Sequence, residues 1–452
     1  MRSTRSATLR HILTAGLVLF ATRGAVAQPA PTDPPPATPP ADQEQPPATP
    51  TAPAAEPPVP VEETPLKPEP EKKTEEKRAV TIKYDNGMKF STADDQFELK
   101  LQFRNQVRFE ANRPLDDETP TRHNQWFNRF YIPRARLQAE GHLFGNDNRF
   151  KAELGMGDSG SFAFLRDMYL EKRLPDSPIY LRFGQWKRPY NRMEIVSDFS
   201  STFNERSIEN EQAGGGRDLG IALHNDYEKS PAPIEWAVGM FNTLNGGQDR
   251  PTWTTACVQD PVTLKIACTN TRPTTFPLDF EPALVARVGY NTPNIKGYSE
   301  SDLEGGPLRY AVAASYKVGL GNLNKGAQDS WADNLSHGFE IDTMIKAWGF
   351  GLEAGVELQK LKTADANVGF YVQPSYFLTP KTIEVAGRFA LITVKEIADD
   401  RKEIETRVAF NYYWHGHIWK IASDGGFIQF LGDTPAPDQP DLQFRVMMQM
   451  QI

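Results

Sequence analysis

Apolar and polar side chains alternate along the segment from Phe97 to Glu110. The even-numbered positions of this segment are all polar, and the odd-numbered positions are apolar apart from Asn105. A repeat of two residues predicts a β-strand, because successive side chains of a strand point to opposite faces of its sheet. One such strand does not show which face meets water, and the pattern of the segments that follow is needed to decide this.

The same alternation recurs after residue 80 and predicts about sixteen strands in all. Long connections such as 189–216 and 243–281 alternate along the chain with tight turns such as 144–148. Outer-membrane barrels combine an even number of antiparallel strands with short periplasmic turns and longer external loops. The sequence therefore predicts an all-β fold, a closed antiparallel transmembrane β-barrel. The connection from Thr292 to Pro307 is too long for a periplasmic turn and is the clearest exception.

The alternating segment 441–452 is expected to close the barrel as its last strand. Aromatic residues near the predicted strand ends favour girdles at the two membrane interfaces: Phe127, Tyr131, Tyr180, Tyr290, Tyr371, Tyr412, Tyr413 and Trp414. A soluble, secreted β-sandwich shows the same alternation and is the main structural alternative.

The first 80 residues have a different composition. Residues 1–27 read as a signal peptide, with a basic start, a short apolar run and an Ala25-Val26-Ala27 cleavage site. Residues 28–80 are rich in Pro, Ala and Glu, and 17 of the chain's 37 prolines fall between 28 and 70. Such a segment buries too little apolar surface to fold, so we expect a disordered periplasmic linker that could contact the cell wall. The barrel domain is assigned to 81–452.

Overall composition narrows the function classes. The formal net charge of −8 argues against a nucleic-acid partner, and the mean hydropathy of −0.53 is too low for a helical membrane protein. Cys257 and Cys268 are the only cysteines, and a close pair in an exported chain predicts a disulfide, with two free thiols as the alternative. The sequence indicates no cofactor and no metal site.

In a barrel, the polar face of each strand becomes the lumen, which here is rich in arginine. Basic clusters in a channel attract anions, although each arginine could instead be paired with an acid in a general diffusion pore. The connection 189–216 is the third external loop, and its charged residues suit a loop folded into the lumen. Candidate residues for the anion path are Lys100, Arg104, Arg108, Arg134, Arg136, Arg182, Lys187, Arg188, Arg192, Arg206 and Arg388.

Three segments carry a family resemblance: RFYIPRARLQAEGHL at 129–143, GQWKRPYNRMEIVSDFSSTFNERS at 184–207 and GGGRDLGIAL at 214–223. They resemble the phosphate-selective porin O and P family, most clearly over residues 126–225. The resemblance implies a sixteen-stranded barrel, a homotrimer, a third loop in the lumen and basic residues along an anion path. Lysines at the constriction are typical of such porins, whereas here Lys187 stands among arginines.

We therefore predict a porin of the Gram-negative outer membrane that passes small hydrophilic solutes and prefers anions, phosphate-like anions among them. Membrane lipid and small anions are its expected partners. A structural tether anchored by the barrel and a barrel enzyme are the alternatives. An enzyme is disfavoured, because Gly157-Asp-Ser-Gly160 lacks a partnered His and Asp and Gly214–Gly216 lacks the Lys of a phosphate loop.

Overall fold

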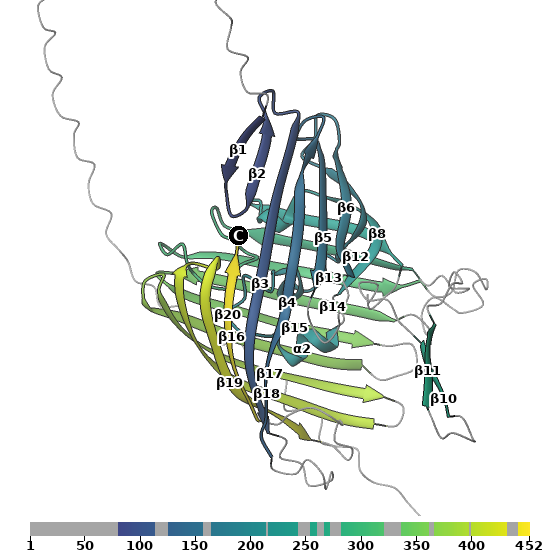
Figure 1. Ribbon diagram of the computed structural model, residues 1–452, viewed down its shortest axis with the longest axis vertical. Coiled ribbons are helices and arrows are strands. Elements are labelled where there is room, and N and C mark those ends of the chain that lie inside the picture. The colour runs from purple at the N-terminus through teal and green to yellow at the C-terminus, as the bar shows by residue number, and fades with distance from the viewer. Residues whose placement is uncertain are drawn as a thin grey trace, which may run out of the picture. The chain divides into compact units, whose positions relative to one another are not determined.

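The computed structural model describes residues 80–113, 125–156, 164–213, 216–242, 254–259, 266–271, 282–320, 336–360, 366–396, 399–431 and 442–452. The proposed signal peptide and nearly all of the proposed linker lie outside these residues. Within them, no helix has the length and apolar character needed to cross a membrane. Strands dominate the described chain (Figure 1).

The main sheet has eighteen strands, and all but β1 and β2 form one closed antiparallel ring. The predicted barrel of sixteen strands is therefore confirmed. The ring strands are β3 (Phe97–Arg113), β4 (Phe127–Leu143), β5 (Asn148–Met156), β6 (Phe164–Arg173), β7 (Tyr180–Lys187), β8 (Arg217–His224), β9 (Ile234–Phe241), β12 (Ala283–Asn291), β13 (Arg309–Gly319), β14 (His337–Ala347), β15 (Phe350–Lys360), β16 (Ala366–Thr379), β17 (Ile383–Glu396), β18 (Asp399–His415), β19 (Trp419–Leu431) and β20 (Leu442–Gln451).

The ring closes between its first and last strands, which lie side by side in Figure 1. Leu442 pairs with Arg113 and Gln451 with Arg104. Phe103 and Ile452 exchange both backbone hydrogen bonds, each with an N···O distance of 2.8 Å. A closed ring leaves no unpaired sheet edge within the bilayer, which is what allows strands to span it.

The alternation of the opening segment separates lipid from lumen. Phe103 and Val107 are 40% and 44% exposed, whereas Arg104 and Arg108 are only 8% and 2% exposed. The apolar face thus points outward and the polar face inward, the reverse of a soluble sheet packed on a core. Counted from β3 around the ring, the connections that follow the second, fourth and later even strands are mostly short turns. We assign the end of the barrel where these turns lie to the periplasm.

One irregularity changes the phase of β4. Gln106 pairs with Arg134, but Arg108 pairs with Tyr131, so β4 carries an extra residue at this point. A bulge of this kind reverses which residues face inward beyond it. Tyr131 consequently lies inside, where its hydroxyl donates to Glu110 at 2.6 Å.

The girdle assignment is wrong for four of the aromatic residues, among them Tyr180, whose hydroxyl accepts from Arg149 in the lumen at 2.7 Å. Besides Tyr131, the hydroxyl of Tyr371 donates to Glu353 at 3.0 Å, and that of Tyr413 donates to Glu384 at 2.5 Å, both within the lumen. Each of these two tyrosines follows another aromatic residue. Since neighbours along a strand face opposite sides, one member of each pair must point inward.

Three further features went beyond the sequence prediction. A hairpin of β1 (Val80–Tyr84) and β2 (Met88–Thr92) precedes the barrel, and β2 pairs with β3 next to the C-terminal residue. A second hairpin, β10 (Thr254–Gln259) and β11 (Ile266–Thr271), lies within the connection between β9 and β12. The long turn between β12 and β13 is buried at its tip, where Ser301 and Asp302 are 0% and 1% exposed.

Candidate functional site

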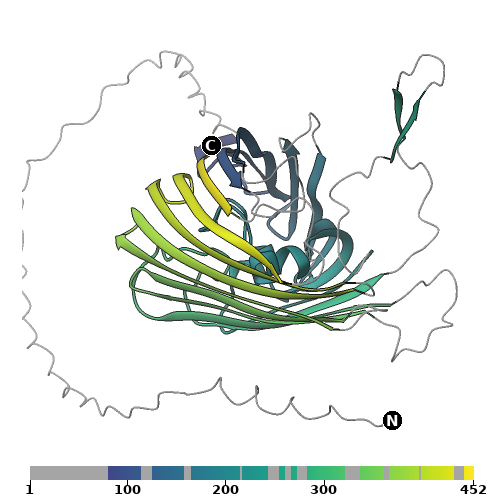
Figure 2. The same cartoon turned by 90° about the horizontal axis from the view of Figure 1, so that it is seen from below.

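The connection between β7 and β8, residues 188–216, is called loop 3 below. It contains helices α1 (Arg192–Ile195) and α2 (Ile208–Ala213), and seen along the barrel its coils lie within the ring of strands (Figure 2). Asn191 caps α1, because its side-chain oxygen accepts from the backbone N–H of Glu194 at 3.0 Å. The predicted inward fold of the third external loop is confirmed.

Inward-facing side chains from opposite parts of the wall hold loop 3. Tyr190 donates to Glu357 of β15 at 3.0 Å, and Arg192 donates to Asp342 of β14 at 2.6 Å. Across the lumen, the backbone N–H of Asn204 donates to Asp424 of β19 at 2.9 Å, and its carbonyl accepts from Arg108 of β3 at 2.9 Å. Loop 3 therefore bridges the lumen and divides it.

A cavity of about 240 Å³ lies on the external side of loop 3, and we call it the external vestibule. Its charged lining comprises five arginines and two carboxylates: Arg129, Arg134, Arg136, Arg166 and Arg206, with Asp198 and Glu205. Positive charge therefore exceeds negative charge at this entrance. A surplus of fixed cations raises the local concentration of anions.

A second cavity of about 360 Å³ lies toward the periplasmic end, and we call it the periplasmic vestibule. It is lined by six cations and six carboxylates: Lys89, Lys100, Arg149, Lys151, Arg182 and Lys229, with Asp85, Glu98, Glu140, Glu171, Asp226 and Glu228. Its charge is balanced. The lumen is thus electrostatically asymmetric along its length.

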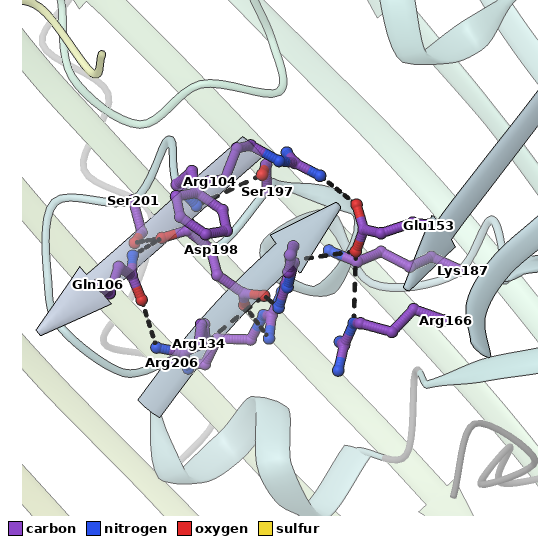
Figure 3. Close-up of polar contacts among 12 residues, drawn as sticks. Arg104, Gln106, Arg134, Glu153, Arg166, Lys187, Ser197, Asp198, Ser201 and Arg206 are labelled. Atoms are coloured by element: carbon purple, nitrogen blue, oxygen red, sulfur yellow. Dashed lines mark hydrogen bonds and ion pairs between the residues drawn. The ribbon is translucent and has the colours of Figure 1, made fainter. Parts of the chain in front are cut away.

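Between the two vestibules, strands β3 to β5 carry three residues that line neither cavity: Arg104, Gln138 and Glu153. The guanidinium of Arg104 donates to both Gln138 and Glu153. Glu153 also lies 3.4 Å from Arg166 and 3.8 Å from Arg217. Figure 3 shows Arg104 and Arg166 both reaching this carboxylate. We call this group the waist.

Asp198 is the main contact between loop 3 and the arginine wall. It pairs with Arg136 of β4 and lies 2.7 Å from Arg206 and 3.6 Å from Arg134 (Figure 3). Burial alone would raise its pKa, but these guanidiniums hold the pKa of Asp198 well below the ordinary value. The carboxylate is therefore ionised at neutral pH and offsets part of the vestibule's positive charge.

Glu205 and Phe199 complete the contact. Burial raises the pKa of Glu205, but Arg134 and Arg108 outweigh burial, so that the net shift is downward. The ring of Phe199 lies 4.9 Å from the Arg104 guanidinium and 5.2 Å from that of Arg136. Such cation–π contacts fix the position of the guanidiniums beside the path.

The predicted path residues fall into three groups. Those that line a vestibule are Lys100, Arg134, Arg136, Arg182 and Arg206. Arg104 lies at the waist. The others are buried against loop 3 or within it and line neither vestibule: Arg108, Lys187, Arg188, Arg192 and Arg388.

The buried group has contacts that hold loop 3. Lys187 donates to the backbone carbonyls of Glu194 and Val196 at 2.6 and 2.8 Å. Arg388 of β17 donates to Gln373 at 2.8 Å, and its guanidinium carbon lies 4.1 Å from the ring of Phe203. These contacts position the loop, and a role in the anion path stays a prediction.

Sequence reasoning missed six cations that line the vestibules: Lys89, Arg129, Arg149, Lys151, Arg166 and Lys229. Arg129 was hidden by the change of phase in β4, and Arg166 follows a Gly/Ser stretch that obscured where β6 begins. Arg149 and Lys151 belong to β5, where polar residues occupy alternate positions. This alternation could have shown that both side chains face the lumen.

One group among the described residues has the spacing of metal ligands: Asp95, Glu98 and His142. Its donor atoms already have partners. The Lys89 ammonium lies 2.8 Å from Glu98, and the Nε2 atom of His142 lies 2.8 Å from the backbone oxygen of Asp95. An ammonium at this distance competes with a cation, so this group does not fit a metal site.

Residues 99–251 match the model of the family described as phosphate-selective porin O and P. This segment of the chain is similar to that porin family. The match confirms the resemblance found in the sequence and covers the whole of loop 3. Together with the closed barrel of sixteen strands, this similarity supports a channel of the porin type.

Three solved structures of other porins are similar to this chain. OmpF of Salmonella typhi, in complex with daunomycin, is 11% identical, and the match covers 82% of this chain and 100% of that one with a TM-score of 0.51. OprB of Pseudomonas putida is 12% identical, and the match covers 78% of this chain and 94% of that one with a TM-score of 0.49. The outer membrane channel DcaP of Acinetobacter baumannii is 12% identical, and the match covers 80% of this chain and 99% of that one with a TM-score of 0.49. The likeness to OmpF supports the barrel fold alone. No curated protein matches the chain.

Proposed function

We propose that this porin passes small hydrophilic solutes by passive diffusion and prefers anions, phosphate-like anions among them. The charge of the external vestibule carries the proposal, since five arginines face two carboxylates there. An anion entering from outside meets a net positive cavity, passes the waist and leaves through a vestibule of balanced charge. Fixed charges at an entrance select by sign because they concentrate one ion and deplete the other.

Loop 3 adds a size limit to this charge selection. It fills the lumen on the side of β14 to β19, whereas the strands that line the two vestibules are β2 to β7. A solute is thereby kept within reach of the arginines. At about 7 Å in a water-like dielectric, one fixed charge changes the energy of a monovalent ion by about 0.6 kcal/mol, or roughly a threefold change in occupancy.

The reversal potential of a planar bilayer under a salt gradient tests the preference. The wild-type porin is expected to be anion-selective, and Arg129→Gln should lower the anion-to-cation permeability ratio by roughly two- to threefold. Arg129 is suitable because its side chain is 61% exposed. Arg173→Gln is the matched control, since Arg173 is 45% exposed and lines neither vestibule. A cation-selective or non-conducting wild type would overturn the proposal.

The same proposal includes the parts of the chain that lie outside the barrel. We propose that residues 1–27 direct export, that 28–80 form a periplasmic linker, and that the barrel assembles as a homotrimer. Composition supports the first two, and the family resemblance alone supports the third. Deleting 28–78 should leave conductance unchanged, whereas a chain that serves mainly as a tether would lose its cellular role. Chemical cross-linking of the folded protein tests the trimer.

A further inference from the structure

The turn between β12 and β13, residues 292–308, lies at the periplasmic end but is far longer than its neighbours there. The turn between β14 and β15, by comparison, spans only Trp348 and Gly349. The tip of the long turn is buried, with Glu300, Ser301 and Asp302 at 4%, 0% and 1% exposure. A polar tip that is buried in a barrel has entered the lumen.

Inward-facing side chains of several strands contact this turn. The hydroxyl of Tyr298 donates to Glu235 of β9 at 2.6 Å, and the Ser301 carbonyl accepts from Lys346 of β14 at 3.0 Å. Gln373 of β16 donates to Glu300 at 2.7 Å, and the Ser301 hydroxyl donates to Glu384 of β17 at 3.1 Å. These contacts extend from β9 to β17, so the turn lies across one half of the barrel.

The turn also contacts loop 3 directly. Arg192 donates to the carbonyl of Gly297 at 2.6 Å, and the backbone N–H of Thr202 donates to Glu300 at 2.7 Å. The backbone N–H of Glu300 donates to the carbonyl of Ser200 at 3.2 Å. The hydroxyl oxygens of Thr202 and Ser301 lie 3.2 Å apart. Loop 3, which enters from outside, therefore meets a segment that enters from the periplasm.

The half of the lumen that these two segments occupy differs in charge from the path. Among the described side chains of β9 to β18, the buried charged groups are eight carboxylates and six cations: Glu235, Glu340, Asp342, Glu353, Glu357, Glu384, Glu403 and Glu405, with Arg287, Arg309, Lys317, Lys346, Arg388 and Arg407. An open route along this wall would favour cations. Neither vestibule is lined by a residue of the turn.

We propose that the turn 292–308 is a second constriction element, which acts with loop 3 to close the acidic half of the lumen. Solutes are then confined to the arginine wall of β3 to β7. The turn sets selectivity by removing a competing route, and it does so without touching the permeating ion. The inference rests on the chain's function as a diffusion channel and does not require the anion preference.

Shortening the turn tests this directly. Replacing residues 294–308 by Asn-Gly supplies a two-residue hairpin turn in the register of the paired strands β12 and β13. We expect single-channel conductance to rise about twofold, as for a second parallel route, and the anion-to-cation permeability ratio to fall. A folded variant with wild-type conductance and wild-type reversal potential would overturn the proposal. Folding is checked by the heat-dependent shift in gel mobility.

A point variant guards against a shortened barrel that fails to fold. Glu300→Ala removes the acceptor of both Thr202 and Gln373 and should increase conductance and its fluctuations. Glu304→Ala is the matched control, because Glu304 lies in the same turn and pairs with Lys296 and Lys346 at 2.9 and 3.6 Å, both outside loop 3. Equal effects of the two variants would count against the contact with loop 3.

A disulfide between the turn and loop 3 tests the same contact by fixing it in place. The double variant Thr202→Cys with Ser301→Cys places two thiols where hydroxyl oxygens lie 3.2 Å apart. We expect a disulfide to form and conductance to stay at the wild-type value, because the link holds an arrangement that already exists. Failure to oxidise would show that the turn does not meet loop 3. The two proposals can fail separately. If the wild-type porin shows no anion preference but the shortened variant still has a higher conductance, the proposed selectivity is contradicted and the second constriction is supported.

Discussion

Asp198 lies 2.7 Å from Arg206, and both residues belong to loop 3, so that the loop carries within itself part of the charge that balances its arginines. The same carboxylate also pairs with Arg136 of the barrel wall. One acid thus serves as the counter-ion of both the loop and the wall. Its removal is the most direct way to make the external vestibule more positive.

Asp198→Asn is expected to raise the anion-to-cation permeability ratio by roughly two- to threefold, the effect of one charge near the path. The amide keeps the size of the side chain, and the contacts of Tyr190, Arg192 and Asn204 with the barrel wall still hold loop 3 in place. Reversal potentials under a salt gradient measure the change. Asp147→Asn is the control, because Asp147 is 57% exposed and pairs with Arg173 outside both vestibules. A ratio that falls or does not change would show that Asp198 does not face the permeating ion.

Substituting Glu153 of the waist is expected to destabilise the barrel. Glu153 is 1% exposed and lies near the guanidiniums of Arg104, Arg136, Arg166 and Arg217. Glu153→Gln leaves these cations without their shared acid, and breaking a buried ion pair in this way costs about 3 kcal/mol.

The midpoint temperature of the heat-dependent mobility shift should therefore fall for Glu153→Gln. Glu98→Gln serves as the comparison, since Glu98 is 20% exposed and has Lys89 as its ion-pair partner. A partly exposed pair of this kind is worth at most about 1 kcal/mol. Equal midpoints for the two variants would mean that the waist arginines find other partners.

The cysteine pair remains a prediction that the backbone supports. Cys257 of β10 and Cys268 of β11 are directly paired in register. Opposite residues of an antiparallel pair have Cα atoms about 4.5 to 5.5 Å apart, within the range that a disulfide spans. The protein purified without reductant should resist maleimide labelling, and reduction should expose two thiols. Labelling of both before reduction would exclude the bond.

The strand count, the inward third loop and the two faces of β3 were predictable, because a period of two and the lengths of connections are local properties of a sequence. The phase of β4 beyond the bulge was not, and Arg129 and Tyr131 were missed or misplaced for that reason. A single extra residue reverses every later side chain of a strand, and alternation alone does not reveal it.

The pairing of the arginines was also beyond sequence reasoning. Arg136 and Asp198 are far apart in the chain and meet only because loop 3 crosses the lumen. The turn 292–308 was correctly singled out as exceptional, but its length did not say where it goes. Its inward course depends on acceptors such as Glu235 and Glu384, which come from strands on both sides of it.

The docking of α2 should depend on pH through Glu209. Burial, and then Glu357 and Glu353, raise the pKa of Glu209 well above its ordinary value. Asp342 contributes in the same direction. A raised pKa means that the docking contribution is complete below the ordinary value and is lost as pH rises through the raised one. The midpoint of the mobility shift should thus fall from pH 5 to pH 8, and Glu209→Gln should flatten this slope. Glu205 has a lowered pKa and is ionised at both pH values, so Glu205→Gln should reduce the midpoint equally at pH 5 and at pH 8. An unchanged slope in Glu209→Gln would assign the pH dependence to another group.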